Sequence, residues 1–260
     1  MMLGHKELTA EEKEIIESRR IKVNRVADGV FLVPAVIIFV FFAKDAVFVG
    51  VGVVRTVLWG LLVAGLLAGV RIGRKTFIIL TLTLNFIAVS FISAMSLFTF
   101  GFSSRSKWKY NSQRKYVDRM HNGHSDCFPN KLPKDIKGYS IDYLPSIMQG
   151  TGHFRVHFRT SAQQLEEYEK TYSAQALYTI PLEKFGGLLR VEVEEIAPGA
   201  EAKIENDKTI DIAYDHKFWE GHDKDATVYV VSAVHNWNHP HSGAVIINKA
   251  EGMVEFTHLG

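Results

Sequence analysis

The sequence predicts an α+β protein in which a three-helix transmembrane anchor precedes an extracytoplasmic domain with a mainly antiparallel β-sheet and one packed α-helix. Three observations lead to this prediction. Residues 30–102 are almost wholly apolar, and residues 103–260 have the mixed composition of a soluble domain. The second region holds one helical pattern followed only by strand patterns, with connections too short for crossover helices.

Residues 1–25 are expected to form a cytoplasmic amphipathic helix. Thr9 and Glu12 have the spacing of a capping box at its start. Basic residues toward the end of this segment favour a position against the inner leaflet of a membrane.

The region 26–102 is predicted to cross the membrane. A bilayer core of about 30 Å needs roughly 20 apolar residues in a helix, and three stretches qualify, at about 26–43, 51–70 and 76–102. Arg55 interrupts the second stretch if that stretch begins at Ala46, so a count of two spans stays open. Lys and Arg residues before the first span and between the second and third place the N-terminus inside, and three spans then place the C-terminal domain outside. The sequence thus predicts an integral protein of a bacterial cell membrane.

Small residues in the apolar region indicate close helix packing rather than a solute pathway. They form a ladder within the second stretch, and Asn85 in the third can bond to a neighbouring helix. The expected partner of this bundle is a second copy of the chain or another membrane protein. The predicted packing residues are Gly60, Ala64, Gly65, Ala68, Gly69 and Asn85.

Residues 103–131 are polar and basic and are expected to be a juxtamembrane linker, and residues 132–260 to be the α+β domain. The segment 132–152 is interpreted as extended chain and turns. Alternation predicts a strand at 153–159, and Ser161 with Gln164 marks the start of an amphipathic helix. Further strands are predicted at 188–196, 208–214, 226–234, 243–248 and 253–258, with Gly252 in the last turn.

The charge balance and the single cysteine argue against a nucleic acid partner and an internal disulfide. The chain has 30 Lys and Arg against 28 Asp and Glu, and residues 103–260 have 19 against 21. Such a balance gives no reason to expect a nucleic acid partner. Cys127 is the only cysteine, so no internal disulfide forms.

The stretch HNWNHPHSG, residues 235–243, raises the question of a metal site. His235, His239 and His241 could converge on zinc, which takes three or four such ligands. Their spacing matches no zinc motif, and the turn-forming residues between them favour a structured loop. No cofactor is therefore expected, with zinc as the alternative.

A second candidate metal cluster lies in HNGHSDC, with His121, His124 and Cys127 as ligands. These residue types suit zinc better than the first set does. Their place in the predicted linker favours a solvated tether.

The predicted strand 153–159 carries a cationic row of His153, Arg155, His157 and Arg159. On an open sheet face this row would bind an anionic group. Cross-strand pairing with the acidic residues Glu192 and Glu194 is the alternative, which we favour.

No convergent catalytic set is evident, so the leading hypothesis is a non-enzymatic binding or interaction module. Its partner would be a protein or an envelope component bound at the outer domain. One alternative is a metal-binding protein or metal-dependent hydrolase that uses His235, His239 and His241. Another is an accessory or sensory subunit that acts through its helix bundle.

Overall fold

The computed structural model consists of two compact units, residues 1–98 and 99–260, and each is described by itself. The structure describes residues 9–50, 52–72, 83, 87, 101–120, 126–146, 151–182, 187–202, 208–235 and 240–260.

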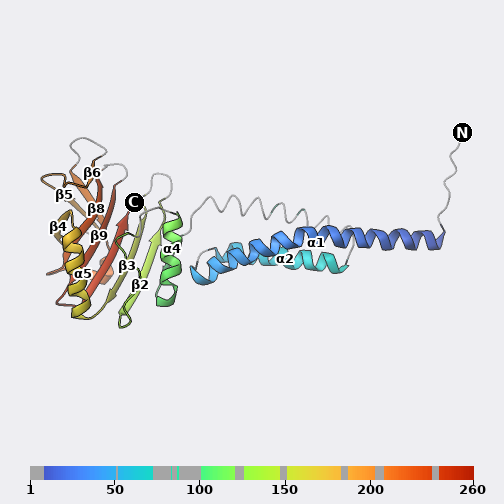
Figure 1. The fold of residues 1–260 in the computed structure, drawn as a ribbon, viewed down its shortest axis with the longest axis horizontal. Coiled ribbons are helices and arrows are strands. Elements are labelled where there is room, and N and C mark those ends of the chain that lie inside the picture. The colour runs from blue at the N-terminus through green and yellow to red at the C-terminus, as the bar shows by residue number, and fades with distance from the viewer. Residues whose placement is uncertain are drawn as a thin grey trace. The chain divides into compact units, whose positions relative to one another are not determined.

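The first unit is a helical hairpin of α1 (Ala10–Phe48) and α2 (Val53–Ile72), which lie side by side (Figure 1). The predicted capping box is present: the Thr9 side chain accepts a hydrogen bond from the Glu12 backbone, and Glu12 accepts one from the Thr9 backbone. The amphipathic segment continues without a break through Pro34 into the apolar region, giving one helix of 39 residues. Thr56 on α2 donates a hydrogen bond to the Phe42 carbonyl of α1, at 3.1 Å.

A small apolar core joins the two helices. It is made of Ala35 from α1 and Trp59, Leu62 and Leu66 from α2, with Leu32, Phe39, Phe42, Leu58 and Val63 packed around it. Burial of this face against the partner helix stabilises the hairpin, because a helix pair gains most of its stability from apolar packing.

Among the described residues, neither helix contains an apolar run long enough to traverse a bilayer. Ionisable residues bound these runs, Asp28 and Lys44 in α1 and Arg55 and Arg71 in α2, and leave 15 residues between them in each helix, fewer than the roughly 20 that a bilayer needs. The predictions of membrane spans at 26–43 and 51–70 are therefore wrong. The predicted transmembrane anchor is wrong with them, and so is the membrane location with a cytoplasmic N-terminus and an extracytoplasmic C-terminal domain. The predicted span at 76–102 lies almost wholly outside the described residues.

The second unit confirms the prediction of an α+β fold with a mainly antiparallel sheet. Its main sheet has the order β1-β2-β3-β10-β9-β8-β4, with every pair antiparallel, and β6 adds to β8 in parallel. The bounds are β1 (Phe102–Ser104), β2 (Lys137–Leu144), β3 (His153–Arg159), β4 (Tyr178–Pro181), β6 (Glu201–Ala202), β8 (Thr227–His235), β9 (His241–Asn248) and β10 (Met253–Leu259).

Helices cover one face of this sheet. They are α4 (Tyr110–Met120), preceded by the short 3-10 helix η1 (Lys107–Lys109), and α5 (Ala162–Gln175). The Ser161 side chain caps α5 by accepting from the Gln164 backbone, as the sequence predicts. Aromatic side chains fill this layer: Phe128 stacks on Phe154 with ring centroids 4.3 Å apart, and Tyr168 meets Phe256 edge to face. Residues 103–131, expected to be a linker, thus carry β1, η1 and α4.

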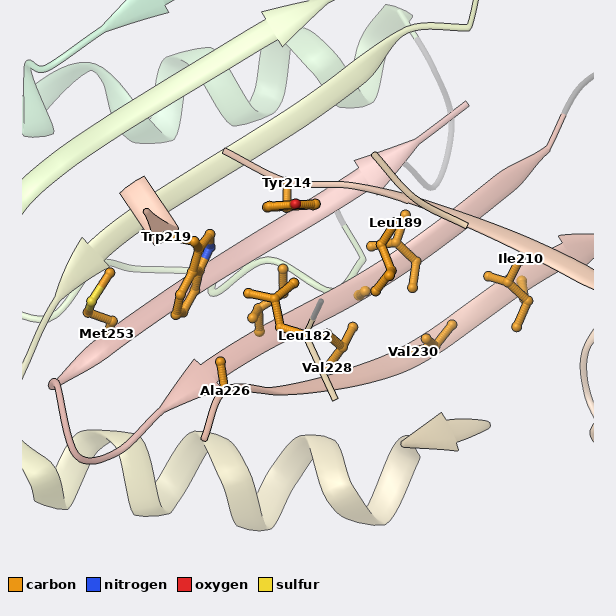
Figure 2. Packing of buried hydrophobic residues seen from close by; sticks show 13 residues of the cluster. Leu182, Leu189, Ile210, Tyr214, Trp219, Ala226, Val228, Val230 and Met253 are labelled. Atoms are coloured by element: carbon orange, nitrogen blue, oxygen red, sulfur yellow. The ribbon is translucent and has the colours of Figure 1, made fainter. Parts of the chain in front are cut away.

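A second, two-stranded sheet covers the opposite face. It consists of β5 (Leu188–Glu192) and β7 (Thr209–Ala213), followed by the one-turn helix α6 (His216–Trp219). Figure 2 shows the core between the two sheets. Its members are Leu182, Leu189, Ile210, Ile212, Tyr214, Trp219, Ala226, Val228, Val230, Ala233, Ala244, Ile246 and Met253. The domain is therefore three layers deep, and β3 and β10 carry polar side chains beneath α6.

Candidate functional site

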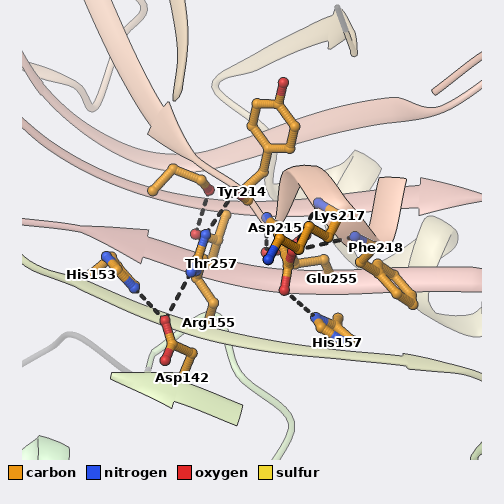
Figure 3. Close-up of polar contacts among 11 residues, drawn as sticks. Asp142, His153, Arg155, His157, Tyr214, Asp215, Lys217, Phe218, Glu255 and Thr257 are labelled. Atoms are coloured by element: carbon orange, nitrogen blue, oxygen red, sulfur yellow. Dashed lines mark hydrogen bonds and ion pairs between the residues drawn. The ribbon is translucent and has the colours of Figure 1, made fainter. Parts of the chain in front are cut away.

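The cationic row of β3 lies on the face of the main sheet that the second sheet and α6 cover, and Asp142 of β2 joins it (Figure 3). One oxygen of Asp142, Oδ2, is 2.6 Å from His153 Nε2 and accepts a hydrogen bond from Arg155 Nη2 at 2.8 Å. Partial burial opposes ionisation of Asp142, but the hydrogen bonds from His153 and Arg155 outweigh it and lower the pKa of this carboxyl. Arg155 also donates to the Tyr214 carbonyl at 2.7 Å.

Glu255 of β10 is fully buried and holds the start of α6 against the sheet. Its two oxygens accept hydrogen bonds from the Asp215 backbone at 2.9 and 3.1 Å, and Oε2 also accepts from Trp219 Nε1 at 2.5 Å. Burial raises the pKa of Glu255 to about 8, although the Arg155 charge and the Trp219 hydrogen bond act in the opposite direction. Asp215 in turn caps α6 by accepting from the Lys217 and Phe218 backbones.

His157 of β3 completes this polar cluster. Its ring stacks on Phe218 with centroids 4.0 Å apart and planes 13° from parallel. Its Nδ1 lies 3.5 Å from Asp215 Oδ2. Burial lowers the pKa of His157 to about 4, with the Asp215 charge opposing the shift, so the ring is neutral at neutral pH. The cluster therefore fixes α6 and the segment before it to the sheet.

The acidic partners differ from those that the sequence favours for this row. β5, which carries Glu192, pairs with β7 and not with β3. The carboxylate beside Arg155 is Asp142, only two residues from the end of β2. Arg159 lies at the far end of the row, 3.4 Å from His222 Nε2.

His235 is a buried histidine with both ring nitrogens engaged. Nε2 lies 3.1 Å from the Tyr178 hydroxyl and Nδ1 lies 3.1 Å from the Thr209 carbonyl. His241 pairs with Val234, the neighbour of His235, so His235 and His241 point to opposite faces of the sheet. His239 lies outside the described residues. Within the described ranges no three His, Cys, Asp or Glu side chains are grouped for a metal ion.

Cys127, the third residue of the other predicted metal cluster, is buried under the helical layer. Its Sγ donates to the Thr257 carbonyl at 3.6 Å. Burial raises the pKa of this thiol to about 12, which disfavours the thiolate form that a metal or a catalytic step requires. His121 and His124 lie outside the described residues.

Of the predicted helix-packing residues, Gly60 lies against α1. A Cβ at Gly60 would lie 3.2 Å from the Phe39 ring of α1. Gly65 and Ala68 are half-buried and Ala64 is exposed. Nothing is described of the surroundings of Gly69, and Asn85 lies outside the described residues.

A basic surface formed by residues 103–137 was not predicted as a site. Residues 103–137 carry nine Lys and Arg against three Asp, whereas residues 138–260 carry ten against 18 Asp and Glu. The exposed cations of this basic surface are Arg105, Lys107, Lys115, Arg119, Lys131, Lys134 and Lys137. The excess of Lys and Arg is visible in the sequence, but only the folded α4 brings these residues onto one surface.

Short contacts hold the parts of the basic surface together. Tyr110 at the start of α4 donates to the Pro129 carbonyl at 2.5 Å, and Lys107 donates to the Ile136 carbonyl at 2.5 Å. Arg114 donates to the Asn130 side chain at 2.7 Å. The segment 129–137 is therefore fixed alongside η1 and α4.

The chain matches no family model, no curated protein and no solved structure. Its function therefore has to be inferred from its own residues.

Proposed function

We propose that the α+β domain is a non-enzymatic binding module that recognises an acidic protein through the basic surface of η1, α4 and the segment 129–137. The observation that carries this proposal is the separation of charge within one domain, nine cations against three acids in 103–137 and ten against 18 in the remainder. Such a surface steers an oppositely charged partner into a fixed orientation.

The basic surface is built on a rigid support, which suits recognition. Tyr110 meets Tyr139 edge to face, and Tyr116 does the same with Phe102 and Tyr143. Val117 is fully buried beneath the helix. Ordered side chains lose little conformational entropy on binding, so a pre-formed helix gains affinity at small cost.

Trp108 supplies an apolar anchor within the basic surface. It is 62% exposed and lies between Lys107 and Lys109, with the Lys109 ammonium 5.2 Å from the ring centroid. Tryptophan is enriched among the residues that dominate interface energies. A protein partner can bury the exposed part of this side chain.

The remainder of the domain argues for an acidic protein rather than a nucleic acid. A nucleic acid that extends past α4 would meet the acidic part of the domain, and the repulsion would offset contacts made by the cations. An acidic protein needs to contact only the basic surface.

The test compares two charge-reversal variants of the full chain. Lys115→Glu with Arg119→Glu changes two exposed cations of α4, and Lys170→Glu with Lys224→Glu changes two exposed lysines elsewhere in the domain. Binding to poly-L-glutamate is measured at several salt concentrations, with a duplex DNA of equal charge as the second probe. We expect the α4 variant to weaken polyglutamate binding by roughly tenfold and to flatten its salt dependence.

The control variant should bind polyglutamate within about twofold of the native chain, a difference expected of charges outside the contact. Equal losses in both variants would show non-specific attraction and would contradict the proposal. So would tighter binding of the DNA than of polyglutamate.

A further inference from the structure

Among the residues that the structure describes, the hairpin leaves an apolar row of α1 exposed. The row consists of Val23, Val26, Val30, Val33, Ile37, Val40 and Val47, whose exposed fractions all lie between 55% and 67%. We call these seven residues the valine stripe. A surface helix in a folded protein normally turns such a row toward a core.

The spacing of the valine stripe is that of a coiled-coil seam. Its members alternate three and four residues apart from position 23 to position 40, and the next two places in the repeat are Lys44 and Val47. A repeat of seven residues with apolar side chains at two positions keeps one seam facing a partner helix over several turns. At 1.5 Å per residue the stripe extends about 36 Å.

The hairpin itself does not use this seam. The residues of α1 that contact α2 are Leu32, Ala35, Phe39 and Phe42, which occupy other positions of the same repeat. The stripe is thus presented outward, together with Phe41 beside it, while these four residues pack within the unit. Pro34 removes one backbone hydrogen bond from α1, but it lies beside the stripe and not on it.

We propose that the valine stripe pairs with the same stripe of a second copy of this chain, in antiparallel orientation about a two-fold axis near residue 35. The stripe is symmetrical about that position: a copy turned end for end places Val30 opposite Val40, Val33 opposite Ile37 and Val23 opposite Val47. A self-complementary patch of this kind is what a two-fold interface requires.

The charges of α1 select the antiparallel arrangement. Residues 11–22 include four glutamates and four basic residues, namely Glu11, Glu12, Lys13, Glu14, Glu17, Arg19, Arg20 and Lys22. A parallel pair would place Glu12 and Arg19, which fall on the continuation of the seam, each beside its own copy. In the antiparallel pair the partner helix ends at Phe48, opposite Lys22, so the charged segments extend beyond the overlap.

The apolar area is sufficient for a specific dimer. Seven stripe side chains from each copy amount to on the order of 1,000 Å² of buried surface, the lower bound for specific protein interfaces. Lys44 lies opposite Val26 at the end of the seam, where its methylene stem can cover the valine while the ammonium reaches water. This inference concerns the helical unit and is independent of the function proposed for the α+β domain.

Disulfide trapping in the full chain tests the proposal and its register. Val30→Cys and Val40→Cys are made separately, one of them with a mass tag, and mixed under mild oxidation. In the antiparallel dimer residue 30 faces residue 40 of the partner, so the mixed disulfide is expected in excess over both like pairs. Two copies of residue 30 would be about 15 Å apart along the axis, beyond the reach of a disulfide.

Leu61→Cys is the matched control, since Leu61 is 66% exposed on α2 and lies outside the stripe. Like pairs at residue 30 in excess of the mixed pair would overturn the antiparallel register. Trapping at Leu61→Cys equal to that of the mixed pair would show random collision and would overturn the dimer.

A second variant avoids reliance on the cysteines. Val33→Lys introduces a charge at the centre of the seam, twice in a symmetric dimer, and should raise the dissociation constant at least about 100-fold in sedimentation equilibrium. Leu61→Lys should leave it within a few-fold, and circular dichroism checks that both variants keep their helix content. A native chain that sediments as a monomer would overturn the proposal outright.

Discussion

Glu255 of β10 and His157 of β3 stand directly opposite each other in the main sheet, and both are held toward their uncharged forms. Burial raises the pKa of Glu255 to about 8 and lowers the pKa of His157 to about 4. A buried acid and a buried base of this kind change the free energy of unfolding with pH in opposite senses.

The first prediction concerns Glu255. Its pKa is about 8 in the folded protein against an ordinary value of 4.5, so the folded state keeps a proton that the unfolded chain releases. The stability that protonated Glu255 contributes is fully present below pH 4.5 and is lost as the pH rises toward 8. Between pH 6.5 and 8 the native protein should lose up to about 1.4 kcal/mol per pH unit relative to Glu255→Gln.

Guanidinium unfolding of both proteins at pH 6.5, 7, 7.5 and 8 measures this difference. The glutamine keeps an oxygen that can accept from the Asp215 backbone, so the variant should fold. Parallel stability profiles for the two proteins would show that Glu255 does not titrate in this range.

The second prediction concerns His157, whose folded pKa is depressed to about 4 from an ordinary value of 6.5. The contribution of His157 to the free energy of unfolding is present above pH 6.5 and is lost as the pH falls toward 4. The reason is that the unfolded chain takes up a proton that the folded protein excludes. The loss should reach up to about 1.4 kcal/mol per pH unit. His157→Phe keeps the stacked contact with Phe218 and removes the titration.

Glu255 has the opposite slope between pH 4.5 and 6.5, so His157→Phe is made in the Glu255→Gln background. Thermal unfolding at pH 4.5, 5.5 and 6.5 then compares two proteins that differ only at residue 157. Finding the histidine protein no more sensitive to acid than the phenylalanine protein would contradict the assignment.

The sequence predicts the strand at 153–159 because it alternates and buries one row of side chains, and it predicts the last hairpin from its turn. Both strands of that hairpin, β9 and β10, are buried on both faces, and Gly252 adopts the positive φ, 70°, expected for the turn between them. α4 was missed because its buried face is weakly apolar, with Gln113 between Tyr110 and Val117. β2 was missed because Gly138 and the flanking prolines resemble a turn, although Tyr139, Ile141 and Tyr143 alternate inward.

The polar cluster could not be predicted from local pattern. Glu255 has the alternation of an exposed strand residue, and it is buried only because α6, about 40 residues earlier in the chain, folds over it. Asp142 and His153 are brought together by the pairing of β2 with β3. Such contacts depend on strand order, which composition and periodicity do not determine.

The third prediction uses a close backbone approach at Gly152. A Cβ at this position would lie 2.4 Å from the Leu144 carbonyl oxygen and from the Ser146 nitrogen, and both are backbone atoms that cannot move aside alone. Gly152→Ala should therefore destabilise the domain by roughly 3 kcal/mol. Gly138→Ala is the control, because Gly138 has φ 62° but nothing within 4 Å of the added methyl.

The control should cost only about 1 kcal/mol, the strain of a left-handed alanine. Urea unfolding followed by tryptophan fluorescence measures both variants, with Trp219 buried in the core as a reporter. If the two substitutions prove equally mild, the approach of these backbone segments is looser than the structure shows.

The fourth prediction concerns the buried thiol of Cys127. Burial raises its pKa to about 12, and its Sγ donates to the Thr257 carbonyl, so the native thiol is both protonated and covered. Iodoacetamide should modify it at least about 1,000-fold more slowly in the native protein than in guanidinium, because only the exposed thiolate reacts. Ser173→Cys adds a thiol on the exposed side of α5. Mass spectrometry of that variant should show one rapid adduct at residue 173 and none at Cys127, whereas rapid modification at both positions would mean that the layer over Cys127 opens readily.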